Sequence, residues 1–172
     1  MLQPQTDIGT DDKVLVIGLG NPILGDDGIG WRVVQQLDGR PSREAYVETD
    51  CLAVGGLGLM ERMLGYQRVI LVDAIVTAKS PVGTVRVLAL AEVEDPGLGH
   101  SASSHDATLW AALQVAAAAG ASVPDRVDIV AIEVPTGYNF TEDLTPSVAA
   151  AVPIAASAVL GLARSDPLIR RN

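Results

Sequence analysis

The chain has 172 residues, the size of one domain, and can bury a core without disulfides or a structural metal. Its net charge of −9 opposes binding to phosphate backbones and anionic lipids, so we expect no nucleic acid partner and no membrane insertion. The single cysteine, Cys51, excludes an internal disulfide, and the polar N-terminus has no signal-peptide pattern. These features predict a cytoplasmic protein.

The first half of the chain alternates short apolar runs with helical periodicity. Hydrophobic residues make up 48% of the chain and aromatic residues only 3%, which is typical of buried parallel strands rich in Val, Ile and Leu. We predict strands over 14–18, 44–50 and 68–74, a helix from Gly28 to about Gly39, and a helix over 57–64 ended by Gly65.

The second half continues the alternation. The pattern predicts a turn over 80–83, an edge strand over 84–90, a helix over 107–119 closed by Gly120, and a strand over 126–134. Thr145 and Pro146 have the residue types of an N-cap and first position, so a last helix should begin there and pack in the core. This order predicts one α/β domain over 1–172, a three-layer sandwich, with a flexible segment 1–12 and a tail 165–172.

Three side chains are candidates for chemistry because ligands bind beyond the carboxyl ends of strands in open α/β sheets. Asp27 follows the first strand, Asp73 ends the third, and His105 lies in the loop before the Ala-rich helix. If the strands are parallel and adjacent, these groups converge as a ligand set for a divalent transition metal such as Ni or Zn. Such a set leaves coordination positions open for substrate or water.

Each candidate also has a structural interpretation. Asp27, like Asp26, has the residue type and position to cap the following helix, and Asp73 to bond turn amides. His105 has the sequence context of an exposed residue beside a helix start. Cys51 is interpreted as a small buried residue, since no Cys-His motif surrounds it.

The glycine-rich stretch "GLGNPILGDDGIG" after the first strand does not fit a nucleotide-binding turn. A dinucleotide fingerprint requires G-x-G-x-x-G, whereas here the third glycine, Gly25, comes two residues late. Asp26 and Asp27 would also place negative charge where phosphates bind. The loop therefore suits a cation better than an anion.

Four segments together resemble the maturation endopeptidases of [NiFe] hydrogenases: "GLGNPILGDDGIG", "ILVDAI", "SSHDATL" and "IEVPTGYNFTEDLTPSV". The resemblance implies a twisted, mostly parallel five-stranded sheet flanked by helices. It also implies an endopeptidase that removes the C-terminal extension of the hydrogenase large-subunit precursor once nickel is inserted. The nickel would be carried by the substrate rather than held as a resident cofactor.

The same resemblance assigns metal contact and catalysis to Asp27, Asp73 and His105, the residues already selected from the strand ends. In relatives the loop's acidic residue is often glutamate, so Asp27 has a shorter reach. The segment "DCLAVGGLG" departs from the D-x-G-T-x-G pattern, which leaves the roles of Asp50, Gly55 and Gly56 open.

Three other functions share parts of this pattern. A metal-reading chaperone or binding module would use the same three ligands without cutting. "GLGNP" also resembles the opening of peptidyl-tRNA hydrolases, but the chain has no histidine before His100 and is strongly acidic. A Rossmann-like nucleotide-binding protein with structural carboxylates is the third alternative.

Overall fold

The computed structural model describes residues 13–39, 46–93 and 104–165, and within these ranges the side chains of Val93 and of residues 104–108 are not described. The described ranges contain one five-stranded sheet in the order β2-β1-β3-β5-β4. Its strands are β1 (Val14–Leu19), β2 (Val47–Leu52), β3 (Arg68–Ile75), β4 (Val85–Ala89) and β5 (Arg126–Glu133). All pairs are parallel except β4 with β5, so the carboxyl ends of four strands share one edge.

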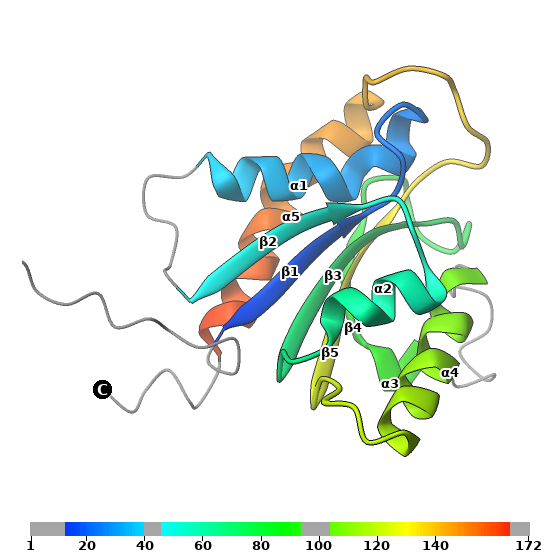
Figure 1. Cartoon of the computed structure of the whole chain (residues 1–172). Coiled ribbons are helices and arrows are strands. Elements are labelled where there is room, and N and C mark those ends of the chain that lie inside the picture. Colours follow the sequence, from blue (N-terminus) through cyan, green and yellow to red (C-terminus); the bar gives the residue numbers. More distant parts are fainter. Residues whose placement is uncertain (1–12, 40–45, 94–103, 166–172) are drawn as a thin grey trace, which may run out of the picture.

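Helices cover both faces of this sheet (Figure 1). On one face lie α1 (Ile29–Asp38) and α5 (Pro146–Arg164). On the other lie α2 (Gly56–Met63), the short α3 (Leu90–Val93) and α4 (Ser104–Ala118), while a 3-10 helix, η2 (Gly25–Gly28), leads into α1. The predicted three-layer α/β sandwich with a mostly parallel five-stranded sheet is therefore confirmed.

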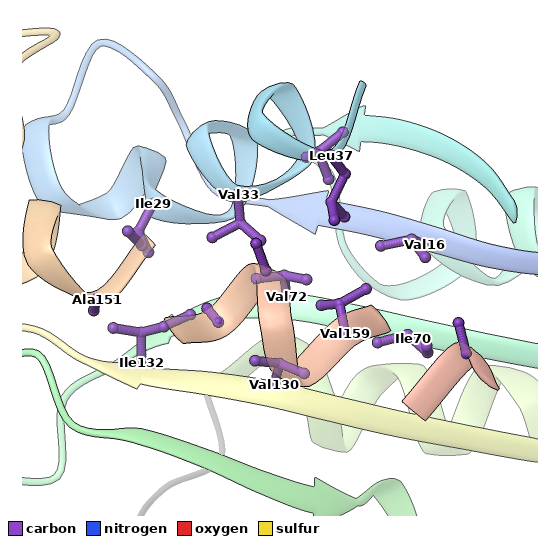
Figure 2. Close-up of a cluster of buried hydrophobic side chains, with 14 of the residues drawn as sticks. Val16, Ile29, Val33, Leu37, Ile70, Val72, Val130, Ile132, Ala151 and Val159 are labelled. Carbon is purple, nitrogen blue, oxygen red and sulfur yellow. The ribbon is translucent and has the colours of Figure 1, made fainter. Parts of the chain in front are cut away.

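Two apolar cores hold the layers together, as the alternation of side chains along buried strands requires. Even-numbered residues of β1 and β3, among them Val16, Ile70 and Val72, pack against α1 and α5 (Figure 2). Odd-numbered ones, among them Ile17 and Leu71, pack against α2 and α4. The faces of the strands thus determine which helix layer each side chain meets.

Within the described ranges, helix α5 alone has the length and composition of a membrane span. It begins as predicted, with Thr145 at the N-cap and Pro146 at the first position. Its inward side chains, such as Val148 and Val159, are fully buried against α1 and the sheet (Figure 2). One face of α5 therefore packs in the core, while the opposite face, which includes Ile154, is exposed.

Two sequence-based placements are corrected by the structure. β3 continues through Ala74 to Ile75, so Asp73 lies inside the strand rather than at its end; its pairing with Ala131 of β5 extends the strand. α4 begins at Ser104, so His105 lies in a helix rather than in the preceding loop. Ser and Asp favour helix starts, and a polar first turn hides the apolar periodicity used for prediction. The predicted flexible segment 1–12 and nearly all of the tail, 166–172, lie outside the described residues.

Candidate active site

The start of α1 packs directly against β1 and β3 because two glycines lack side chains. A Cβ at Gly18 would collide with the carbonyl group of Gly30, and a Cβ at Gly30 would collide with the carbonyl oxygens of Leu19 and Val72. These glycines permit close approach of two backbones rather than of a phosphate. The result is a tight connection that fixes η2 over the carboxyl end of the sheet.

Asp27 lies in η2 and is half-buried. Its Oδ2 atom accepts a 2.6 Å hydrogen bond from the backbone N–H of Asn21, six residues earlier. Gly20, between β1 and this contact, has φ of +112° and no room for a Cβ beside the carbonyl oxygen of Asp27. The carboxylate therefore stabilises the loop in which it lies and does not cap α1. The N-cap of α1 is Gly28, and no described side chain donates or accepts a capping hydrogen bond there. Within the described residues the second oxygen of Asp27, Oδ1, accepts no hydrogen bond and forms no ion pair.

The neighbouring carboxylate, Asp26, joins this loop to the start of α5. Its two oxygens accept hydrogen bonds from the backbone N–H (2.7 Å) and hydroxyl (2.9 Å) of Thr145, at the start of α5. The backbone of the same loop pairs with the β5–α5 connection through Leu24 and Thr141. Two segments more than a hundred residues apart thus lie side by side (Figure 1).

Asp73 lies on β3, directly beside β1. It shares the strand face of Leu71 and Ile75, which belong to the core under α2 and α4. The side chain is half-buried, and its Oδ1 atom accepts a 2.8 Å hydrogen bond from the N–H of Ala74. Because η2 contacts β3, the structure brings the segments that carry Asp27 and Asp73 to the same edge of the sheet.

His105 lies in the first turn of α4, four residues before Leu109, which is fully buried in the core on the face of Asp73. The chain continues from the end of α4 to Arg126, where β5 begins at the amino end of the sheet. The first turn of α4 therefore lies at the opposite, carboxyl end of the sheet (Figure 1). The histidine side chain is outside the described residues. Among the side chains that are described, no group of three His, Cys, Asp or Glu residues is close enough to hold a metal.

The sequence interpretation missed one buried carboxylate at this edge, Glu133 at the end of β5. It accepts hydrogen bonds from the hydroxyl and N–H of Thr77 (2.6 and 2.7 Å) and from the N–H of Ala78 (2.9 Å), and it pairs with Arg86 at 3.5 Å. Burial raises the pKa of Glu133, but these hydrogen bonds outweigh it and the net pKa is lowered. A charge within the apolar run "IVAIEV" is the signal that could have found it.

Glu133 orders the connection that leaves β3 after Asp73. Ala78 in that connection has φ of +55°, an unusual conformation for a residue with a Cβ, and Glu133 holds its N–H. The backbone of Val134 also donates to the carbonyl of Ile75. We assign Glu133 a structural role, because its oxygens are occupied by donors from its own chain.

Acidic side chains of β2 are likewise held by partners within the chain. Arg62 of α2 donates to Asp50 (2.6 Å) and to Glu48 (2.9 Å), so the position of Asp50 is fixed by an ion pair. Burial, with Asp50 and Asp38 nearby, raises the pKa of the Cys51 thiol to about 11. A thiol of this kind is a poor nucleophile at neutral pH, although Cys51 is half-buried rather than buried as predicted.

Comparisons with known proteins agree with this architecture. The model of the hydrogenase maturation protease family (HycI) matches residues 32–162. The hydrogenase 2 maturation protease of Escherichia coli (strain K12) is 32% identical over 155 residues, which cover 90% of this chain and 92% of the relative. The chain therefore belongs to the hydrogenase maturation protease family, and it is an endopeptidase of that class.

Solved structures give the same result for the fold. The hydrogenase maturating endopeptidase HybD from E. coli superimposes with a TM-score of 0.71 at 32% identity, covering 88% of this chain and 92% of that one. The [NiFe] hydrogenase maturation protease HybD from Thermococcus kodakarensis has a TM-score of 0.67 at 22% identity, with 88% and 99% covered. The second likeness concerns the fold alone.

Proposed function

We propose that this endopeptidase removes the C-terminal extension of a nickel-loaded [NiFe]-hydrogenase large-subunit precursor and recognises the precursor through its nickel. The observation that carries the proposal is the position of Asp27. Its carboxylate accepts a hydrogen bond from a loop amide, and its other oxygen has no protein donor in the described residues. Asp27 belongs to η2, which contacts β3, the strand that carries Asp73. An oxygen of this kind can fill an open position on a substrate metal.

In this proposal Asp27, Asp73 and His105 all contact the substrate nickel. Asp73 contributes from β3, on the strand face covered by α4, and His105 contributes from the first turn of α4. Two carboxylates and an imidazole suit a divalent first-row metal. A precursor without nickel lacks the atom that these three side chains bind, so its extension is not held at the cleavage point.

Cleavage proceeds by attack of water on the carbonyl carbon of the scissile peptide. The carboxylates of Asp27 and Asp73 and the substrate nickel jointly position the water, and a carboxylate of the site accepts its proton, as in aspartic-type hydrolysis. The carbon–nitrogen bond then breaks and the proton passes to the departing amine. No covalent enzyme intermediate forms, which agrees with the raised pKa of Cys51.

The partner is the large-subunit precursor, and we place the reaction in the cytoplasm. The acidic balance of the chain, −9 overall, supports a protein substrate rather than nucleic acid or an anionic membrane. Cleavage would release the subunit to close over its metal centre.

The test incubates the purified protein with nickel-loaded and nickel-free precursor and follows both by intact mass. We expect only the loaded precursor to lose its extension, leaving two products whose masses sum to the precursor plus one water. Equal cleavage of both forms would contradict recognition through nickel. Binding of the loaded precursor without any shortening would instead identify a metal-reading partner that does not cut.

A further inference from the structure

Three of the exposed large apolar side chains lie on the loop that leads to Asp27 and on the β5–α5 connection that is hydrogen-bonded to it, whereas others, such as Leu57 and Ile154, are exposed elsewhere. Ile23 in the β1–η2 loop is 50% exposed, and Tyr138 and Phe140 in the β5–α5 connection are 71% and 89% exposed. Phe140 is the only phenylalanine of the chain. We call these three residues the apolar lip.

The apolar lip lies on two segments that are pinned to each other. The N–H of Thr141, next to Phe140, donates to the carbonyl of Ile23, and the N–H of Gly25 donates to the carbonyl of Thr141. Asp26 adds two hydrogen bonds to Thr145. Because its backbone is ordered before binding, the lip loses little conformational freedom when a partner covers it.

The charges around the lip favour one kind of partner. Glu142 and Asp143 lie two and three residues after Phe140 and are exposed, and the stretch 134–147 contains no Lys or Arg. Arg32 also reaches the segment, where its guanidinium donates to the backbone carbonyl of Glu142 and keeps its positive charge, so the two carboxylates outnumber this one cation. An apolar surface bordered by acidic groups is complementary to an apolar surface bordered by basic ones.

We propose that the apolar lip is the docking surface for the folded body of the substrate protein, where it contacts an apolar patch bordered by Lys or Arg. The proposal rests on the proposed function, since Ile23 precedes Asp27 by four residues in one loop and the segment of Phe140 is hydrogen-bonded to that loop. Docking at the lip would align the cleavage junction with the carboxyl edge of the sheet. Phe140 is the central anchor, since large aromatic side chains dominate such interfaces.

The experiment compares Phe140→Ser and Ile23→Ser with Val115→Ser, an exposed valine on α4. Affinity for the nickel-loaded precursor is measured by biolayer interferometry, and KM and kcat are measured by intact mass. We expect Phe140→Ser to weaken binding and raise KM by about tenfold or more, the loss typical of an aromatic anchor. Ile23→Ser should have a smaller effect of the same kind, kcat should hold within about twofold, and Val115→Ser should match the wild type.

The outcomes separate this proposal from the proposed function. Wild-type affinity and KM in Phe140→Ser, with nickel-dependent cleavage intact, would overturn the docking surface and leave the function standing. Loss of binding in the lip variants, when the wild type binds the precursor without cutting it, would support the docking surface and overturn the cleavage. An equal loss of affinity for a short peptide spanning the junction would assign the lip to the extension and overturn the proposal.

Discussion

The two ends of the parallel sheet treat their carboxylates in opposite ways. At the amino end, Asp128 is 2% exposed and pairs with Arg126 at 2.9 Å and with the buried Arg68 at 3.4 Å. At the carboxyl end, Asp27 is half-buried and held by one backbone amide. The first carboxylate is paired within the chain, whereas the second forms no ion pair in the described residues and has an open oxygen for a ligand.

The difference separates carboxylates that stabilise the fold from carboxylates that are available to bind a ligand. A buried carboxylate is stable only when paired and hydrogen-bonded, which is the state of Asp128 and also of Glu133. A carboxylate that is positioned by its backbone but not paired is available to a cation brought by another molecule. The contrast predicts that substitutions at the two ends separate activity from stability.

The largest expected effect is at the carboxyl end. Asp27→Asn keeps the shape and the acceptor for the N–H of Asn21 but removes the charge, so it should lower cleavage of the nickel-loaded precursor by about 1,000-fold. Thermal unfolding should stay close to wild type, and Asp27→Glu should retain activity because it restores the charge. Wild-type cleavage by Asp27→Asn would contradict the role of this carboxylate.

The amino end should respond in the opposite way. Asp128→Ala removes the buried carboxylate that pairs with Arg68 and Arg126, so we expect the free energy of unfolding to fall by about 3 kcal/mol. Denaturant titration measures the loss. Cleavage by the fraction that remains folded should match wild type, and a selective loss of activity would break the contrast between the two ends.

Gly30 tests whether the close packing at the start of α1 stabilises the fold. Gly30→Ala forces a methyl group against backbone carbonyls of β1 and β3, which should cost about 2 kcal/mol of stability. Gly161→Ala is the matched control, because that helical glycine has open space and should gain up to about 1 kcal/mol. If both variants have equal stability, the close packing at the start of α1 is unimportant.

Glu133 should make the free energy of unfolding depend on pH. Its folded pKa lies below the ordinary value of 4.5, so the stabilisation is present above that value and is lost as pH falls through the folded pKa. Glu133→Gln should therefore cost about 1–3 kcal/mol at pH 7, and the gap to wild type should shrink below pH 4.5. A gap that is constant down to pH 3.5 would contradict the lowered pKa.

The smallest effect is expected at the latch between Asp26 and Thr145. A double-mutant cycle with Asp26→Ala and Thr145→Val should give a coupling of about 1 kcal/mol, since each removes the same exposed hydrogen bond. Denaturant unfolding of the four proteins measures it. Additive effects would show that the latch contributes no interaction energy.

The sequence predicted the layers because buried strands and amphipathic helices have different periods. The apolar runs of β1, β3 and β5 and the alternation of β4 led to the correct sheet, including its edge strand. Contacts across long sequence separations were beyond such reasoning: the partner of Asp26 is 119 residues away. Glu133 was missed because a lone charge in an apolar run does not reveal its donors, and the start of α4 because its first turn is polar.

In the proposed function, side chains at the carboxyl end of the sheet bind the nickel of the substrate. The direct measurement is the affinity of wild type, Asp27→Asn and His105→Gln for nickel-loaded and nickel-free precursor, at low temperature while intact mass shows no cleavage. The account predicts that wild type prefers the loaded precursor and that each variant binds the two forms equally. A preference for nickel that is undiminished in both variants would contradict it.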